Sequence, residues 1–184
     1  MSKFLKSFVL AGVLALAAPA FANTVMVGGE EMFPTKTIVE NAVKSADHTT
    51  LVTAVKAAGL VDTLSGKGPF TVFAPVNAAF AALPAGTVDT LLKPENKDQL
   101  TGVLTYHVVA GRLTVDDLKA WIKKGRGTAE LKTVAGGKLW ASMNGPSNIM
   151  LKDENGGWAN ITIYDVMQSN GVIHAIDKVL MPRS

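Results

Sequence analysis

The chain contains no cysteine, and this absence removes several possibilities. The fold cannot depend on disulfide bonds. Attachment to a lipid through an N-terminal cysteine is excluded, and so is a metal site with thiolate ligands. The three histidines do not stand at metal-ligand spacing either. We therefore expect a fold that packing alone stabilises, with no metal site and no cofactor.

Long apolar runs are absent after residue 22. Before that point, Lys3 and Lys6 precede an apolar segment from Phe8 to Ala18, and Ala20-Phe21-Ala22 matches the small-residue pattern of a cleavage site. These three parts together are typical of a secretory signal peptide. We expect cleavage between Ala22 and Asn23, a mature chain without a membrane span, and a secreted or periplasmic location.

The chain also lacks a strong charge of either sign. Its 18 Lys and Arg exceed its 15 Asp and Glu by 3, and loss of the signal peptide removes two lysines, which leaves a net charge of +1. Nucleic acid is therefore not an expected partner, because its recognition needs a basic patch. The length suits one domain. We assign 1–22 to the signal peptide, 23–36 to an N-terminal arm and 37–184 to the domain, and we expect a monomer.

Motifs of common enzymes are missing as well. The sequence has no Gly-x-Ser-x-Gly nucleophile elbow. Gly66-Lys67-Gly68 lacks the glycine spacing and the hydroxyl residue of a phosphate-binding loop. Gly125-Arg126-Gly127 lacks the third glycine of a dinucleotide fingerprint. We therefore predict no catalytic residue and a non-enzymatic protein.

The local pattern that is present changes near residue 128. Before it, helix signals dominate: Thr37 with Glu40 fits a capping box, Thr114 with Asp117 starts another helix, and Gly59 is placed to end a helix. After it, Gly- and Asn-rich turns separate strands predicted near 129–134, 138–143, 148–152 and 158–167. Helices followed by strands indicate the α+β class with a largely antiparallel sheet system.

The strongest strand pattern lies between the Asn170-Gly171 turn and Pro182. Over Val172–Leu180 the alternating side chains give two faces that are both mostly apolar. A strand of this kind is covered on both sides. Residues three apart on a strand point to opposite faces, so we do not expect His174 to pair with Asp177.

This closing segment resembles the last motif of the fasciclin-like (FAS1) domain family. Two further motifs of that family stand upstream in the right order: Gly68 to Pro75 followed by Asn77 and Phe80, and the pair Tyr106-His107. The similarity extends from about residue 35 to residue 182. One departure is Val76, where family members often carry a small hydroxyl residue.

The resemblance implies the FAS1 fold, a two-sheet β-wedge with several short helices packed along one side. It also implies structural roles for seven motif residues, namely Asn77, Phe80, His107, Asn170, Gly171, His174 and Asp177. In animal adhesion proteins of the family, the Tyr-His segment and an Asp followed by two aliphatic residues are proposed integrin-binding elements. The partner-binding candidates that match them by position are Tyr106, His107, Asp165, Val166 and Met167.

The function implied by the resemblance is an exported adhesion or interaction module that binds a protein or glycan at the cell surface or in the envelope. Two alternatives stay open. A deep apolar pocket would favour a periplasmic protein for a small ligand. A polar cleft that exposes His107 or His174 beside a carboxylate would favour an enzyme. We expect both rings to be buried and hydrogen-bonded, Tyr106 and His107 to lie on a strand over 105–110, and His48 to be exposed.

Overall fold

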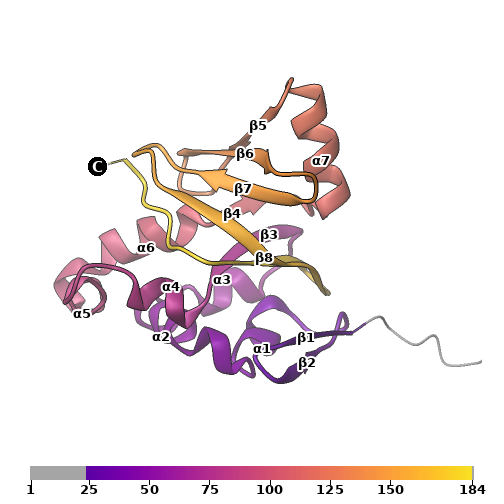
Figure 1. The fold of residues 1–184 in the computed structure, drawn as a ribbon. Coiled ribbons are helices and arrows are strands. Elements are labelled where there is room, and N and C mark those ends of the chain that lie inside the picture. Colours follow the sequence, from indigo (N-terminus) through magenta and orange to yellow (C-terminus); the bar gives the residue numbers. More distant parts are fainter. Residues whose placement is uncertain (1–23, 184) are drawn as a thin grey trace, which may run out of the picture.

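The computed structural model describes residues 24–183, so the predicted signal peptide and its cleavage site lie outside the described residues. Figure 1 shows short helices packed beside a strongly bent sheet. The helices are α1 (Ile38–Ala42), α2 (Thr49–Ala58), α3 (Val61–Ser65), α4 (Asn77–Ala81), α5 (Thr87–Leu91), α6 (Lys97–Tyr106) and α7 (Val115–Lys124), with 3-10 turns η1 (Ala46–His48) and η2 (Pro94–Asn96). The strands are β1 (Val25–Val27), β2 (Glu30–Met32), β3 (Phe70–Pro75), β4 (Val108–Ala110), β5 (Thr128–Lys132), β6 (Lys138–Asn144), β7 (Asn148–Lys152), β8 (Trp158–Gln168) and β9 (Gly171–Ile176).

A seven-stranded sheet in the order β4-β3-β9-β8-β7-β6-β5 forms the body of the domain. Among the described pairs of neighbouring strands in this sheet, only β3 and β9 are parallel. The register between β8 and β9 shifts between Ile161 and Val166, and such irregularities bend a strand. A bridge between Val109 and Thr133 brings the two outer strands together. The sheet is therefore nearly closed, which confirms the predicted wedge.

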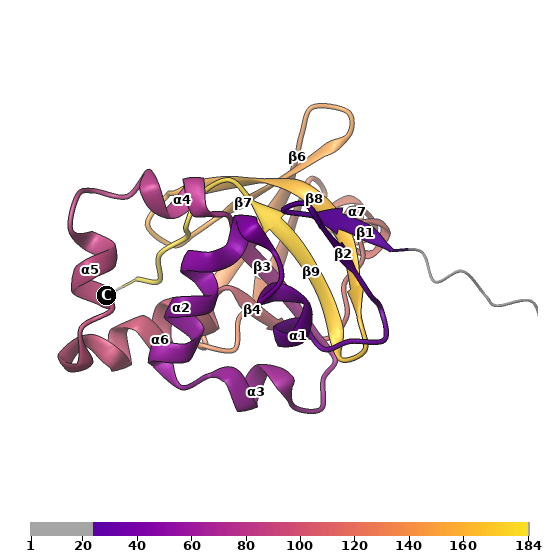
Figure 2. The same cartoon turned by 90° about the horizontal axis from the view of Figure 1, so that it is seen from below.

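The buried apolar residues form two clusters. The helix-side cluster lies between helices α1, α2, α3 and α6 and strands β3 and β9, and Figure 2 shows α1, α2 and α3 on the near side of the domain with α6 beside them. It consists of Val27, Met32, Ile38, Leu51, Ala54, Val55, Ala58, Leu60, Leu64, Val72, Ala74, Leu91, Leu100, Leu104, Val108, Val166 and Ile173. The sheet-interior cluster consists of Phe73, Tyr106, Val109, Leu113, Leu118, Ile122, Ala129, Leu131, Leu139, Ala141, Ile149, Leu151, Ala159, Ile161, Ile176 and Leu180.

The predicted helix signals form as expected. The Thr37 and Thr114 side chains accept hydrogen bonds from the backbone of Glu40 and Asp117, and each acidic side chain accepts one in return. These bonds satisfy N–H groups that the first turn of a helix leaves free. Gly59 has a φ of 73° and ends α2 in the left-handed conformation, which glycine adopts at little cost. None of the helices in 24–183 has the length and apolar character needed to cross a bilayer.

Three sequence predictions about elements need correction. Residues 97–106 form α6, so Tyr106 is helical and only Val108–Ala110 form a strand. Residues 24–36 of the predicted arm pack on the domain, because β1 and β2 pair and place Val27 and Met32 in the helix-side cluster. The closing strand ends at Ile176 and not at Leu180, and the next residue, Asp177, donates its N–H to the Asn160 carbonyl.

Candidate functional site

The Tyr106-His107 pair lies at the end of α6 and is buried. The His107 Nδ1 donates to the Val103 carbonyl at 2.8 Å, and its Nε2 accepts from the Leu180 N–H at 3.0 Å. Burial lowers the pKa of His107 to about 4, so the ring is neutral at pH 7. His107 therefore ties the chain after β9 to α6, as its predicted structural role requires.

Tyr106 has no exposed surface, so it offers no contact to a partner. Its hydroxyl donates to the Lys138 carbonyl at 2.6 Å and accepts from the Glu154 N–H at 3.2 Å. Burial raises the pKa of Tyr106 to about 12. Because both side chains are buried, we do not assign partner contact to Tyr106 or His107. Their polar atoms instead connect α6 to the turns of the sheet.

His174 on β9 is also buried and fully bonded. Its Nε2 donates to the Leu113 carbonyl at 2.8 Å, and its Nδ1 accepts from the Asp165 N–H at 3.2 Å. Burial lowers its pKa. Asp177 does not pair with it, since both Asp177 carboxylate oxygens accept from Asn160, at 2.7 and 3.0 Å. A His–Asp catalytic pair is therefore not assembled here.

The Asn170-Gly171 turn holds three elements in place. The Asn170 Oδ1 accepts from the Ile38 N–H at 3.0 Å, and its Nδ2 donates to the carbonyls of Leu64 and Gly66 at 2.8 and 3.0 Å. A Cβ at Gly171 would lie 2.1 Å from the Phe70 carbonyl oxygen, so only glycine allows β3 to approach here. This motif therefore fixes α1 and α3 against the start of the parallel strand pair.

Asn77 and Phe80 also have structural positions. Asn77 is the first residue of α4, and its side chain does not cap that helix. Its Oδ1 accepts from the Thr50 N–H at 3.0 Å and its Nδ2 donates to the Ala46 carbonyl at 2.8 Å, so it caps α2. Phe80 packs against the helix-side cluster.

The segment Asp165-Val166-Met167 has mixed exposure. Asp165 has a φ of 53° at the irregular part of β8, and its Oδ1 accepts from the Val115 N–H at 2.8 Å. It thus caps α7, where a carboxylate is stabilised by the helix dipole. Val166 is buried in the helix-side cluster. Of the five predicted partner contacts, Asp165 and Met167 alone are partly exposed.

An open depression adjoins this segment, and we call it the Asn170 depression. Its volume is about 640 Å³, and its lining consists of Thr37, Ser65, Gly66, Lys67, Gly68, Pro69, Arg112, Ser169 and Asn170. Lys67 and Arg112 are exposed and give it a positive charge, and none of these lining residues is acidic. The Arg112 Nη2 donates to the carbonyls of Gln168 and Ser169 at 3.1 and 3.4 Å, which holds the guanidinium at the end of β8.

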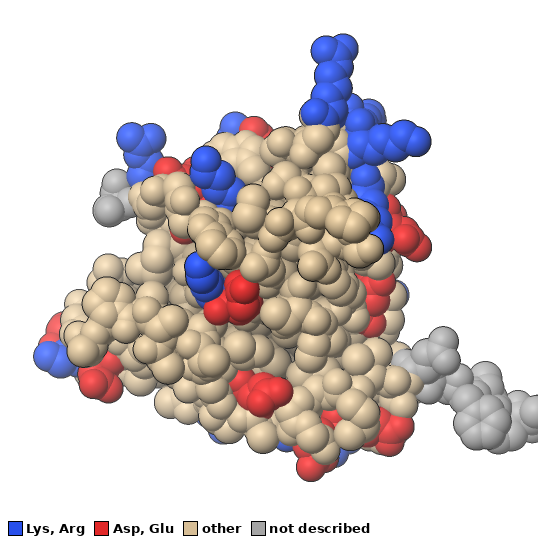
Figure 3. Space-filling model, in the orientation of Figure 1, with Lys and Arg blue, Asp and Glu red and all other residues tan. Residues whose placement is uncertain are grey.

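In Figure 3 most of the visible face is uncharged, and Lys and Arg gather at the end of the molecule formed by α7 and β5. Asp116, Asp117 and Glu130 belong to the same two elements, so both signs of charge meet there. Within 24–183, no group of three or more His, Asp or Glu side chains is placed to hold a metal ion.

Sequence reasoning missed one residue. His48 was expected to be exposed, but only 3% of its surface is accessible. It precedes Leu51, Val55 and Ala58, which are all buried on α2, and this spacing places it on the apolar face of the helix. That periodicity was the available signal for its burial.

Comparison with known proteins agrees with the fold and the motifs. The model of the fasciclin domain family matches residues 46–182. The chain is 49% identical over 146 residues to protein sll1483 of Synechocystis sp., covering 79% of this chain and 73% of that protein. It is 39% identical over 123 residues to the cell surface glycolipoprotein MPB83 of Mycobacterium bovis (strain BCG), covering 67% of this chain and 48% of that protein.

A solved structure shows the same fold. The FAS1 domain pair of the insect cell adhesion molecule fasciclin I superposes with a TM-score of 0.70 at 19% identity, covering 81% of this chain and 52% of that one. The family model, the relatives and the ordered motifs agree, and the chain belongs to the fasciclin domain family.

Proposed function

We propose that this chain is an exported, non-enzymatic interaction module that binds a protein or glycan at the cell surface or in the envelope. The proposal rests on the observation that the polar motif residues are occupied in structural hydrogen bonds. The rings of His107 and His174 and the carboxylate of Asp177 are engaged in hydrogen bonds that hold the fold. A role as base or nucleophile would require them to give up these bonds. A relative that is a cell surface glycolipoprotein supports the same class, and so does the shared fold with a cell adhesion molecule.

We assign partner contact to the Asn170 depression and the adjoining Met167. Lys67 and Arg112 suit acidic groups, and the lining residues Thr37, Ser65 and Ser169 add hydroxyls that suit acidic or hydroxyl-rich groups of a glycan or protein. Met167, which lies near the end of β8 two residues before the lining residue Ser169, adds a partly exposed apolar contact. Charged groups of this kind set orientation and association rate more than total affinity.

A charge-reversal experiment tests this assignment. The mature protein is immobilised, and binding of cell-envelope fractions from the source organism is measured for wild type and for Lys67→Glu combined with Arg112→Glu. The matched control is Lys93→Glu, an exposed lysine between α5 and η2. We expect the double variant to lose most of the binding, on the order of tenfold, because two attractive contacts become repulsive. The control should bind like wild type.

The outcomes separate the function from the surface. Absence of any saturable binding by the wild-type protein would contradict the interaction role. Wild-type binding that the double variant retains in full would contradict the assigned surface. Circular dichroism of each variant establishes that the fold is intact before the comparison is made.

A further inference from the structure

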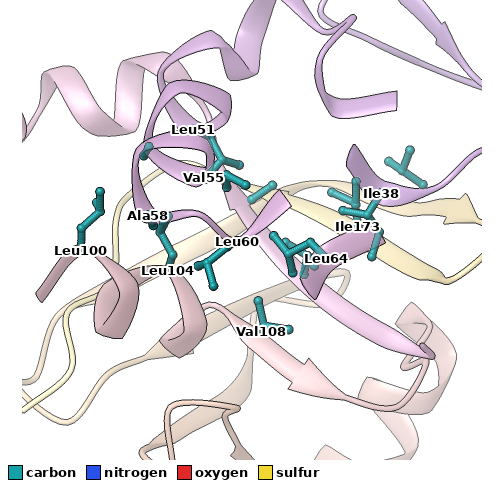
Figure 4. Close-up of a cluster of buried hydrophobic side chains, with 14 of the residues drawn as sticks. Ile38, Leu51, Val55, Ala58, Leu60, Leu64, Leu100, Leu104, Val108 and Ile173 are labelled. Carbon is teal, nitrogen blue, oxygen red and sulfur yellow. The ribbon is translucent and has the colours of Figure 1, made fainter. Parts of the chain in front are cut away.

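An apolar cavity of about 240 Å³ lies inside the helix-side cluster. Leu51 and Val55 from α2, Ile38 from α1, Leu64 from α3 and Ile173 from β9 belong to its lining, and Figure 4 shows these side chains facing a common interior. Protein interiors contain few voids larger than a water molecule. An apolar cavity of about 150 Å³ is already large enough to accept benzene. The space here is therefore sufficient for a small organic molecule.

The cavity reaches the surface between α1 and α2. Val43, which follows α1, is 48% exposed although it belongs to the lining, and Lys56 on α2 is also exposed at the edge. The partly exposed Val39, Val52 and Val61 belong to the same rim. A ligand can therefore enter without unfolding the sheet.

Among the buried side-chain polar atoms that the structure describes, the Nε2 of His48 is the one without a hydrogen-bond partner. Its Nδ1 lies 2.9 Å from the Ser45 Oγ in a hydrogen bond. Among the residues that the structure describes, none bonds to its Nε2, although only 3% of the residue is accessible. The Ala74 carbonyl faces the ring and raises the pKa of His48 as a backbone acceptor does, but its distance and angle to Nε2 do not meet those of a hydrogen bond.

An unbonded buried nitrogen is costly, because it has lost its hydrogen bond to water without a replacement. A single water is a poor replacement here, since a buried water needs two to four polar partners. The other buried imidazole of the lining, His107, already uses both ring nitrogens. The remaining buried side chains of the lining are apolar except Ser45, whose hydroxyl already bonds the Nδ1 of His48. Apart from the Ala74 carbonyl, the described lining therefore offers an isolated water at Nε2 no further polar group that is free to bond.

We propose that this cavity is a binding site for a small, uncharged, mainly apolar molecule with one hydroxyl group, and that this hydroxyl pairs with the Nε2 of His48. The apolar body of the ligand fills the space between α1, α2 and the sheet. This inference is independent of the partner surface at the Asn170 depression, because the two sites share no lining residue.

The hydroxyl follows from the chemistry of the ring. The Ser45 hydroxyl can either donate to Nδ1 or accept from it, so Nε2 can serve as a donor or as an acceptor. A hydroxyl group can accept a hydrogen bond from Nε2 or donate one to it, so it suits both forms of the ring. Burial also lowers the pKa of His48, so the ring is neutral and does not offer a buried cation to a carboxylate. An anionic ligand would place its charge at the rim near Lys56 instead.

Three probes with one ring system test the proposal: naphthalene, 2-naphthol and 2-naphthoate. Binding to the mature protein is measured by isothermal titration calorimetry at pH 7. We expect 2-naphthol to bind about tenfold more tightly than naphthalene, because it alone satisfies the unbonded nitrogen. Naphthoate should bind more weakly than 2-naphthol. Addition of 2-naphthol, but not of naphthalene, should also shift the ¹⁵N resonance of the His48 Nε2.

Two variants locate the site. His48→Phe keeps a ring of similar shape and should remove the preference for 2-naphthol while naphthalene still binds. Ala42→Leu enlarges a lining residue at the end of α1 and should weaken both probes. Its matched control, Ala82→Leu, enlarges an exposed alanine after α4 outside the lining and should change neither.

Four results would overturn the proposal. They are an absence of binding by naphthalene and 2-naphthol, equal affinity for the two, a preference for 2-naphthol that persists in His48→Phe, and tightest binding of naphthoate. The last would place the polar contact at Lys56. If His48→Phe does not fold, the ¹⁵N shift in the wild-type protein decides between a contact at Nε2 and none.

Discussion

The two apolar clusters differ in how completely they are packed. In the sheet-interior cluster, Leu139, Ala141, Ile149, Leu151 and Ala159 have no accessible surface. The helix-side cluster contains a cavity of about 240 Å³ and a histidine nitrogen without a partner. Both are apolar, so hydrophobicity alone does not decide which one packs fully.

The difference follows from how each cluster is built. In the sheet, continuous hydrogen-bonded pairing fixes the spacing and register of every strand, so side chains from facing strands meet at set positions. On the helix side, α1 and α3 have only 5 residues each, and each presents few side chains to the core. The sheet therefore supplies most of the rigidity, and the helix side has room for a ligand.

Truncation of a core leucine gives the largest expected effect. Leu139→Ala in the sheet-interior cluster should lower the free energy of unfolding by about 2–5 kcal/mol, because it leaves a void that a tightly paired sheet cannot close. Leu51→Ala, beside the existing cavity, should fall at the low end of that range. Urea denaturation of both variants measures the contrast. Equal losses would show that the two clusters are equally well packed.

Acid should destabilise the protein through its buried histidines His107, His174 and His48, whose pKa values are all lowered by burial. The pKa of His107 is about 4 in the folded state, below the ordinary 6.5. Between these values only the unfolded chain binds the proton, so stability is complete above pH 6.5 and falls as the pH decreases toward 4. Binding of one proton over this pH interval corresponds to a loss of about 3 kcal/mol in the free energy of unfolding by pH 4.

Denaturation curves at pH 7, 5.5 and 4 test this dependence. His174, whose pKa is also lowered, contributes in the same direction. The variant His107→Gln has no titrating ring, and its stability should fall less steeply between pH 6.5 and 4. If the stability of His107→Gln fell as steeply with pH as that of wild type, proton binding by His107 on unfolding would not be the cause of the pH dependence.

The bonded and unbonded histidines should respond differently to substitution. His174→Ala leaves the Asp165 N–H and the Leu113 carbonyl without their partner and should cost about 1–3 kcal/mol. His48→Phe should change stability by less than about 1 kcal/mol, because loss of the Ser45 bond is offset by removal of the unbonded nitrogen. Thermal melts provide the measurement. A large loss in His48→Phe would indicate that its Nε2 has a partner after all.

Local signals predicted the ends of elements well. The capping boxes at Thr37 and Thr114 and the αL glycine at position 59 satisfy backbone groups within a few residues, so the sequence carries the whole motif. The strands after residue 128 were also predictable, because alternation and turn residues determine hairpins locally.

Long-range contacts could not be predicted in the same way. The stretch Thr105–Ala110 is apolar and was read as a strand, but packing of Leu100, Val103 and Leu104 extends α6 to Tyr106. Short apolar runs do not distinguish strand from buried helix. The targets of Asn77 and Asp165 are the starts of α2 and α7, 27 and 50 residues away in the chain. Nothing near these residues in the sequence marks those partners.

The smallest expected effect is a gain in stability. Ala42→Leu adds apolar atoms to a residue that lines the cavity, and burying them there should stabilise the protein by up to about 1 kcal/mol. The same change at Ala141, which has no accessible surface inside the sheet, should cost about 1–3 kcal/mol because no space exists for the added atoms.

The comparison of these two alanines isolates packing from composition, since the chemical change is identical. Both variants are measured by urea denaturation at pH 7, and Ala82→Leu on the exposed end of α4 corrects for the effect of adding leucine to the surface. Opposite signs for Ala42→Leu and Ala141→Leu would establish that the free space lies on the helix side. Destabilisation of similar size at both positions would mean that the helices cannot accommodate added atoms, and the distinction between the two clusters would fail.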